Sequence, residues 1–562
     1  MRKLTKITAA AMTAAMLAAP VTGALPDVLS VTASAKEVTS GDWKYRVDYD
    51  GTIEITDYKG SAADVKIPSK IDGKTVTEIG SWAFQNCTSL KSVTIPDSVT
   101  ELYGNVFSGC TALTSVTIPD SVTEIRGYAF RGCTSLASVT IPSGVTEIDG
   151  SAFSGCTSLK EIKVDSKNEN YISVDGILFS KDKTVLVCYP GGKGTSYTIP
   201  DSVTKIGKYA FYDGTSLKSV TIPDNVTEID DYAFLGCASL TSVTIPDSVT
   251  EIGTEAFGNC TSLKSVTISD SVTKIRSLVF SGCTSLKSVT IPDGVTKIGI
   301  CAFSGCDSLT SVNIPNGVTK IDKSAFEGCA SLTSVTIPNS VTEIGESAFS
   351  DCASLKSVII PNGVKTIRTK TFYGCKLLTS VTIPESVESI QALTFFGCKS
   401  LTNVTIPSRV TEINYDTFLG CPSLKTVTIP KGVKWVGQNA FRDCTLLETV
   451  NYTGSKADWD KIESYGGNDP LYKAKINYNY KPSNTPVTPK PEKTVYKSTT
   501  DVVGDVDGDG KTSAKDATAI LKYIVGLADF EGNSMKNALV TGGKTPSARD
   551  ATQILKKAVG LA

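Results

Sequence analysis

The most informative absence in this 562-residue chain is histidine, which does not occur at all. Without imidazole the chain has no histidine general base, no Ser-His-Asp triad and no histidine metal ligand. Neither sign of charge dominates, because 56 Lys and Arg face 57 Asp and Glu, and no basic stripe predicts a nucleic-acid partner. Beyond the first 35 residues, no apolar run approaches the ~18 residues of a membrane span, so the sequence predicts no membrane insertion.

What the chain has instead is a repeat of 23 residues. A leucine recurs at this step from Leu217 to Leu447, and a phenylalanine keeps the same step as far as Phe441. Self-similarity at a fixed period predicts a solenoid, in which each unit stacks only on its neighbours. We therefore expect a β-rich, curved or twisted rod, and a binding surface rather than a catalytic cleft.

Each unit contains one clear strand, SVTIP, which is rich in β-branched residues and ends at its proline. In one copy Val243 and Ile245 should point inward, while Ser242 and Thr244 point outward. The following TEIG segment makes a second turn, and the AF-x-x-C segment packs its phenylalanine under the next unit. A single unit is too small to fold alone, so the units depend on one another.

The period breaks once, because Leu159 and Leu217 are 58 residues apart. Within the insertion, at about 165–200, SVDGILFSKDKTVLVCY predicts a β-hairpin with strands at 177–179 and Val185–Cys188. The hairpin is either a structural variant of the solenoid or a place that holds a partner.

The unit matches LxxVxIPxxVxxIgxxAFxxC and resembles the BspA-like (Treponema-type) leucine-rich repeat. This resemblance covers 81–447, with GDWKYRVDYDGTIEITDY in an N-terminal cap (36–80) and VNYTGSKADWDKI in a C-terminal cap (448–480). It implies a secreted or surface protein with a role in adhesion and partner binding, not an enzyme.

Sixteen cysteines in one chain invite a disulfide framework, but their placement argues against it. Fourteen occupy one position of the repeat, from Cys87 to Cys444, which favours a ladder of buried free thiols. In-register parallel pairs would be strained as disulfides. Cys188 and Cys301 lie off the ladder, so these two are expected to be more reactive than the ladder thiols, although a structural role is favoured even for them.

Residues 1–35 have the pattern of a signal peptide. Arg2, Lys3 and Lys6 precede an apolar stretch at 7–19, and Ala33-Ser34-Ala35 is an A-x-A cleavage site. We expect the chain to be exported, extracellular and held near the cell by another protein.

A calcium-binding loop follows a proline-rich linker at 481–498. GDVDGDGKTSAKD supplies oxygen donors at the alternate positions that Ca²⁺ prefers, with Gly510 at the sharp turn. The predicted ligands are Asp505, Asp507, Asp509, Lys511 through its carbonyl, Ser513 and Asp516.

The loop has no entering helix, and its exiting segment KDATAILKYIVGLA returns 34 residues later as RDATQILKKAVGLA. Residues 499–562 therefore resemble a dockerin, a small all-α domain that docks onto a cohesin module of a scaffoldin. By this resemblance the cohesin-facing residues are Ala514, Lys515, Leu521, Lys522, Ala548, Arg549, Leu555 and Lys556. The second loop offers Leu539, Thr541 and Gly543 at the carboxylate positions, so one calcium ion is predicted and a second is doubtful.

The ligand surface of the solenoid is predicted from exposed aromatics, because sugar faces stack on rings. These residues precede the AF motif in different neighbourhoods of the array: Trp82, Tyr128, Tyr209 and Tyr232. The prediction is a non-catalytic protein that binds a protein or polysaccharide and docks on a cellulosome-type scaffoldin. The alternatives are an accessory enzyme of a polysaccharide-degrading complex and a structural spacer.

Overall fold

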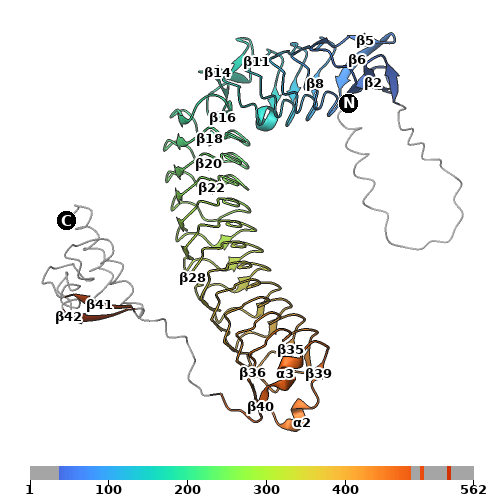
Figure 1. Ribbon diagram of the computed structural model, residues 1–562. Coiled ribbons are helices and arrows are strands. Elements are labelled where there is room, and N and C mark those ends of the chain that lie inside the picture. The colour runs from blue at the N-terminus through green and yellow to red at the C-terminus, as the bar shows by residue number, and fades with distance from the viewer. Residues whose placement is uncertain (1–36, 483–493, 499–527, 533–562) are drawn as a thin grey trace, which may run out of the picture.

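The computed structural model describes residues 37–482, 494–498 and 528–532. Residues 37–482 form a solenoid of short parallel strands, which confirms the predicted stack of repeats (Figure 1). The predicted signal peptide, the calcium ligands and the cohesin-facing residues lie outside the described residues.

Each unit contributes one strand to each of two faces. The long-strand face is built from SVT strands, as in β21 (Ser242–Thr244) and β23 (Ser265–Thr267), which pair in parallel with Ser242 opposite Ser265. The short-strand face is built from two-residue strands such as β20 (Glu228–Ile229) and β22 (Glu251–Ile252). The AF-x-x-C segments form the third side, the loop face.

The part of the solenoid before the insertion, the first arm, consists of these elements: β1 (Val38–Ser40), β2 (Trp43–Val47), β3 (Ile53–Tyr58), β4 (Asp64–Lys66), β5 (Lys70–Ile71), β6 (Lys74–Ile79), β7 (Ser92–Thr94), β8 (Glu101–Leu102), β9 (Ser115–Thr117), β10 (Glu124–Ile125), β11 (Ser138–Ile141), β12 (Glu147–Ile148), the 3-10 turn η1 (Gly150–Phe153) and β13 (Glu161–Val164).

The second arm follows the insertion. Its long-strand face contains β17 (Ser196–Thr198), β19 (Ser219–Thr221), β21, β23, β24 (Ser288–Thr290), β26 (Ser311–Asn313), β28 (Ser334–Thr336), β30 (Ser357–Ile359), β32 (Ser380–Thr382), β34 (Asn403–Thr405), β36 (Thr426–Ile429), β38 (Thr449–Tyr452) and β40 (Lys475–Asn477). Its short-strand face contains β18 (Lys205–Ile206), β20, β22, β25 (Lys297–Ile298), β27 (Lys320–Ile321), β29 (Glu343–Ile344), β31 (Thr366–Ile367), β33 (Ser389–Ile390), β35 (Glu412–Ile413), β37 (Trp435–Val436) and β39 (Glu463–Ser464).

Two ladders run through the core along the loop face. The phenylalanine rings stack in parallel. The ring centres of Phe303 and Phe326 are 5.3 Å apart, and their planes are inclined by 4°. All sixteen cysteines are free, which confirms the predicted thiol ladder. The Cys306 thiol donates to the carbonyl of Phe280 at 3.2 Å, so each buried ladder thiol is a hydrogen-bonded part of the core.

The insertion forms the predicted hairpin, β15 (Ile177–Ser180) with β16 (Val185–Cys188). The structure adds a third antiparallel strand, β14 (Tyr171–Val174), which the sequence analysis missed. Because strand side chains alternate, the hairpin has two buried faces. Leu178 and Cys188 pack into the core of the first arm, whereas Phe179 packs into that of the second.

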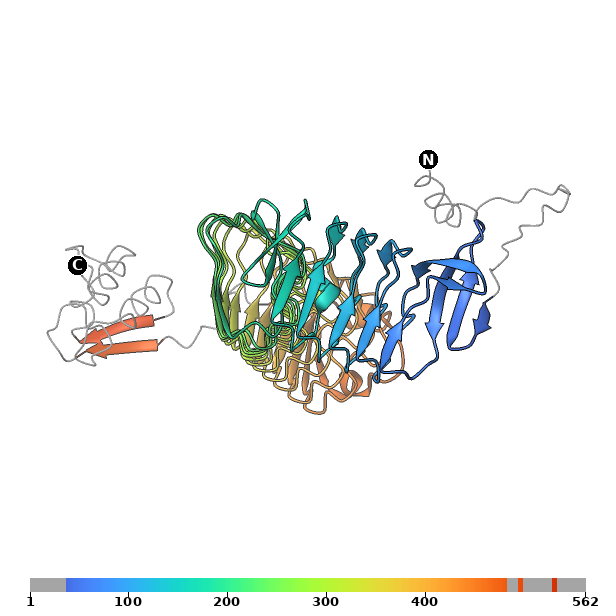
Figure 2. The same ribbon diagram turned by 90° about the horizontal axis from the view of Figure 1, so that it is seen from above.

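The favoured structural role of Cys188 is confirmed, whereas the expectation that it is more reactive than the ladder thiols is wrong. The side chain is buried in the hairpin, and burial raises the pKa of its thiol to about 12. The hairpin is a partition between two cores. At this partition the solenoid bends sharply, so that the two arms point in different directions (Figures 1 and 2).

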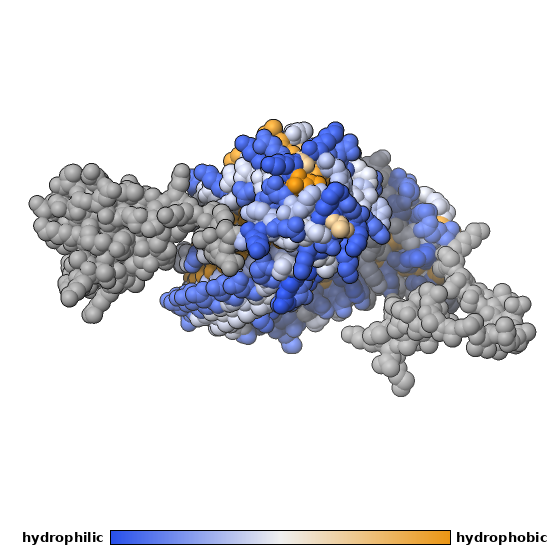
Figure 3. Space-filling model, turned by 90° about the horizontal axis from the view of Figure 1, so that it is seen from below, coloured by the Kyte–Doolittle hydropathy of each residue, from blue (hydrophilic) through white to orange (hydrophobic). Residues whose placement is uncertain are grey.

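Both ends of the solenoid are covered. The predicted N-terminal hairpin is present as β2 and β3, while α2 (Lys456–Trp459) and α3 (Asp469–Lys473) lie in the C-terminal cap. The cap end shows a mostly hydrophilic surface with only small apolar patches (Figure 3). Within the ranges given above, no helix has the length and apolar content needed to cross a membrane.

Two further strands, β41 (Thr494–Ser498) and β42 (Ala528–Gly532), pair in parallel. The first lies at the end of the predicted linker, where Thr-Val-Tyr has high strand propensity. The second lies between the two repeated segments of the predicted dockerin, so an all-α domain does not describe these five residues.

Candidate functional site

The tyrosines predicted as a ligand surface occupy one backbone position of the repeat, two residues before the core phenylalanine. Tyr128, Tyr209 and Tyr232 follow β10, β18 and β20, and each has a φ of 60–61°. This left-handed conformation recurs at the same position in most units, although bulky residues rarely adopt it. The backbone conformation of this position is thus fixed by the solenoid, while its side chain varies from unit to unit and is partly exposed at the three tyrosines.

The insertion brings these tyrosines together. Tyr209 stacks on Tyr232, with ring centres 4.9 Å apart and planes 9° apart. Tyr128, from the first arm, meets the edge of Tyr209 at 6.3 Å and that of Tyr212 at 6.1 Å. The expectation that Tyr128 and Tyr209 lie in different neighbourhoods is wrong, because the bend folds the loop faces of the two arms against each other.

Close backbone approach supports this contact. A Cβ atom on Gly150 would lie only 2.2 Å from the carbonyl oxygen of Lys208, so only glycine fits there. Next to it, the Ser154 hydroxyl donates to the Asp213 carboxylate at 2.8 Å, again across the two arms. The cyan turn η1, which begins at Gly150, lies on the inner side of the bend (Figure 1).

Trp82 does not join this group. It lies in the first unit of the solenoid, next to the N-terminal cap, and its side chain is 55% exposed. The structure therefore assigns three of the four predicted aromatic residues to one site and leaves the fourth as an isolated exposed ring.

Two cations flank the tyrosine cluster, which we define as Tyr128, Tyr209, Tyr212 and Tyr232. The Lys208 ammonium lies 5.3 Å from the centre of the Tyr209 ring and 5.9 Å from that of Tyr232. The Arg131 guanidinium lies 5.5 Å from the Tyr128 ring. These are cation–π distances, and they give the surface a positive rim.

Two phenols of the cluster, Tyr209 and Tyr212, have a raised pKa and are neutral at physiological pH. Burial, followed by the charges and hydroxyls of neighbouring tyrosines, raises the pKa of Tyr209 well above its usual value. Burial also raises the pKa of Tyr212, with the Asp213 carboxylate as the next cause. The cluster therefore offers aromatic rings and hydroxyl groups beside two cations, a combination suited to a polyhydroxylated ligand.

The sequence analysis missed Tyr212, Lys208 and Arg131. A usable signal existed for the first of these, because YAFY places tyrosines on both sides of Phe211. The two cations had no such signal, since lysine and arginine are spread over the whole repeat array.

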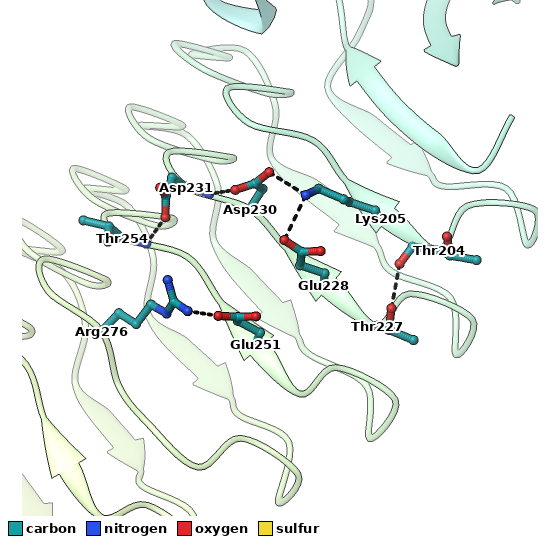
Figure 4. Close-up of polar contacts among 9 residues, drawn as sticks. All are labelled: Thr204, Lys205, Thr227, Glu228, Asp230, Asp231, Glu251, Thr254 and Arg276. Atoms are coloured by element: carbon teal, nitrogen blue, oxygen red, sulfur yellow. Dashed lines mark hydrogen bonds and ion pairs between the residues drawn. The ribbon is translucent and has the colours of Figure 1, made fainter. Parts of the chain in front are cut away.

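The glutamates of the TEI segments lie on the short-strand face and form ion pairs (Figure 4). The Lys205 ammonium lies 2.9 Å from Glu228 and 2.8 Å from Asp230, and Arg276 pairs with Glu251. Exposed pairs of this kind contribute about 0–1 kcal/mol each. The carboxylates are thus part of a solvated charged face.

Hydroxyls on the same face link successive units. The Thr227 hydroxyl donates to the carbonyl of Thr204 at 3.2 Å, and Asp231 accepts from the backbone N–H of Thr254 at 2.7 Å (Figure 4). Across the described ranges, which exclude the predicted calcium loop, no group of three or more acidic or cysteine side chains could hold a metal ion.

Comparison with known proteins agrees with the repeat architecture. The family described as "BspA type Leucine rich repeat region (6 copies)" matches residues 58–182, 188–306, 273–378 and 365–465. No curated protein matches the chain.

Similar solved structures come from several bacteria. A leucine-rich repeat protein from Eubacterium ventriosum is 29% identical over 56% of this chain and 93% of its own, with a TM-score of 0.47. One from Bacteroides ovatus is 29% identical over 78% and 99%, with a TM-score of 0.46. A leucine-rich cell surface protein from Faecalibacterium prausnitzii is 28% identical over 77% and 99%, with a TM-score of 0.39.

Proposed function

The chain belongs to the BspA-type leucine-rich repeat family, and we propose that it is an exported, non-catalytic binding protein with a dockerin tether. Its solenoid binds a polysaccharide or a protein. Its C-terminal segment docks on a scaffoldin cohesin in a calcium-dependent manner, which places the solenoid on a cellulosome-type complex at the cell surface.

The observation that carries the solenoid half of this proposal is the tyrosine cluster. Tyr209 and Tyr232 form a stacked pair of nearly parallel, partly exposed rings, and Lys208 lies beside both. Aromatic rings with a polar edge combine apolar contact with hydrogen bonding. This is the chemistry that a sugar ring requires, with its apolar C–H face and its ring of hydroxyls.

The tether rests on the sequence of 499–562. Asp505, Asp507, Asp509, Ser513 and Asp516, with the Lys511 carbonyl, would hold one calcium ion, which orders the loop ahead of the segment 515–528. The repeated segments then present Lys515 and Arg549 to the cohesin.

A structural spacer is the second candidate. It is favoured by the contacts that the cluster tyrosines make with one another across the two arms. Such contacts would also hold the two arms at a fixed angle. The two candidates differ in whether the tyrosine cluster contacts a ligand.

The tether is tested by binding the full-length chain to a panel of cohesins, with calcium and with chelator. We expect tight binding that is lost on chelation and in the double variant Asp505→Ala/Asp516→Ala. Asp443→Ala, which removes an exposed carboxylate elsewhere, is the matched control and should bind normally. Failure to bind any cohesin while calcium-loaded would remove the scaffold assignment.

The solenoid is tested separately, on arrays of plant and bacterial polysaccharides. We expect binding that falls at least tenfold in Tyr232→Ala and is retained in Tyr373→Ala, which alters a comparable ring stack on Phe396. Binding that is equal in both variants would leave the spacer as the better description.

A further inference from the structure

A cleft of about 1060 Å³ opens on the long-strand face where the two arms meet. One wall is β13 of the first arm, another is the β14–β15 turn at Asp175 and Gly176, and the third includes Tyr197 in β17. The cleft exists because the long-strand sheet stops at β13 and restarts at β17, and these two strands do not pair with each other.

The edge of β13 that faces the cleft is already hydrogen-bonded. The backbone N–H of Ile162 donates to the carbonyl of Gly176 at 2.8 Å, and the Ser173 hydroxyl donates to the Ile162 carbonyl at 2.6 Å. The β14–β15 turn thus takes the place of the next strand on this side.

The edge of β17 is open. Thr195 and Ile199 direct their backbone groups toward β19, because Ser219 donates to Thr195 and Ile199 donates to Thr221. Backbone groups alternate along a strand, so those of Ser196 and Thr198 point the other way, toward the first arm. No hydrogen bond from another part of the described chain reaches these two residues, and an open strand edge is a template for a further strand.

Lysines from two segments surround the cleft, Lys160 and Lys163 at β13 and Lys193 before β17. Lys163 is offset by Glu161 at 3.4 Å, and Lys193 donates to the backbone carbonyl of Asp175. Lys160 has no carboxylate partner within the described ranges. The lining also carries the carboxylates of Glu161 and Asp175, so three lysines against two acids leave one positive charge for an acidic ligand to neutralise.

The aromatic residue of the cleft is unsuited to stacking on a sugar. The Tyr197 ring packs on Tyr189 at 5.0 Å and lies 6.3 Å from Phe211, so its faces are engaged by the core. Burial raises its pKa to about 12, so it stays neutral. With Val164 and Ile177 it forms an apolar floor for an inward-pointing side chain.

We propose that the β17 edge binds an extended acidic peptide segment of a partner protein as an added strand. The backbone of Ser196 and Thr198 would supply the hydrogen bonds, Lys160 and Lys193 the preference for acidic side chains, and the apolar floor a site for alternate residues. The inference rests on the proposed function in one respect, that the solenoid is a binding module, and it names the class of partner.

The test uses the full-length chain and labelled eight-residue peptides in which valine alternates with glutamate, glutamine or lysine. We expect the glutamate series to bind at least tenfold more tightly than the lysine series. Thr198→Pro should reduce binding at least tenfold, because it removes an N–H of the open β17 edge that is not used by β19. Thr198→Ala keeps that N–H and should bind normally.

Charge is tested by Lys160→Glu, with Lys264→Glu as the control, since Lys264 precedes a long strand distant from the cleft. Only the first should weaken the glutamate peptide. Equal affinity for the glutamate and lysine series, or full binding by a folded Thr198→Pro variant, would overturn the proposal. Binding of a uronic-acid oligosaccharide that is lost in Lys160→Glu but kept in Thr198→Pro would overturn it too. Neither the cohesin assay nor Tyr232→Ala reports on this site. A negative result for peptide binding therefore leaves the proposed function standing, and the reverse also holds.

Discussion

At the scale of single residues, the buried thiols couple stability to alkaline pH. Burial raises the pKa of Cys283 to about 12, above its ordinary value of 9.0. A thiol that ionises in the unfolded chain but not in the folded one stabilises the fold fully below pH ~9, and this contribution is lost as the pH rises toward 12. Each such thiol should reduce the free energy of unfolding by roughly 1 kcal/mol per pH unit in that range.

The measurement compares the wild-type chain with Cys283→Ala in chemical denaturation at pH 8 and pH 10. We expect the variant to lose less stability between the two pH values, by the contribution of one thiol. An identical pH dependence would show that Cys283 ionises equally in both states. Tyrosine and lysine titration affects both proteins alike, so the difference isolates the thiol.

Exposure also ranks the thiols by reactivity. Among the sixteen cysteines only Cys87 and Cys301 are half-buried, and the rest are buried. The neighbouring Cys110 side chain is the largest cause that lowers the pKa of Cys87, which favours its thiolate. A water-soluble thiol reagent at neutral pH should therefore modify two sites in the native protein, identified by peptide mapping. Modification of Cys188 in the folded chain would contradict the buried partition.

At the scale of elements, the two faces of the inserted hairpin should each stabilise a different arm. Leu178 is buried in the first core and its neighbour Phe179 in the second. Leu178→Ala should destabilise the first arm by about 2–5 kcal/mol, and Phe179→Ala the second by about 3–5 kcal/mol, because each leaves a cavity. Hydrogen exchange followed by mass spectrometry checks this, and each variant is the control for the other. If both variants speeded hydrogen exchange in the same arm, the two faces of the hairpin would not serve different cores.

The elements also show what a repeat sequence can predict. The 23-residue period determines the strands, the stacked phenylalanines and the thiol position, because every unit repeats the same local environment. The strand Val185–Cys188 could be predicted from its apolar run. The strand Tyr171–Val174 was missed, because all four residues are half-buried and give no apolar pattern in the sequence. This segment is a strand because it pairs with β15.

The tyrosine cluster could be predicted only in part. Tyr209 and Tyr232 are one period apart, so their stacking follows from the repeat. The contact of Tyr128 with Tyr209 depends on the direction in which the hairpin turns the second arm. That direction is a tertiary property of two packed cores, and it occurs once in the chain, so no periodic signal encodes it.

At the scale of the whole molecule, the bend is the feature on which both binding surfaces depend. The inner side of the bend brings the tyrosine cluster together, and the gap between β13 and β17 forms the cleft on the long-strand face. The tyrosine cluster requires the loop faces of the two arms to touch. The closest backbone approach that we identify there is Gly150 against the Lys208 carbonyl, where an added Cβ would lie at 2.2 Å.

Gly150→Ala should therefore open the bend. Backbone atoms cannot yield as a flexible side chain does, so the overlap is relieved by moving the arms apart at the loop face. We expect a larger radius of gyration in small-angle X-ray scattering and weaker polysaccharide binding, because Tyr128 separates from Tyr209. Gly294→Ala is the control, since its added Cβ would meet its nearest neighbour at an ordinary 3.5 Å. A scattering curve for Gly150→Ala that matches the wild type would show that this contact does not set the angle, and that the partition hairpin alone holds the two arms.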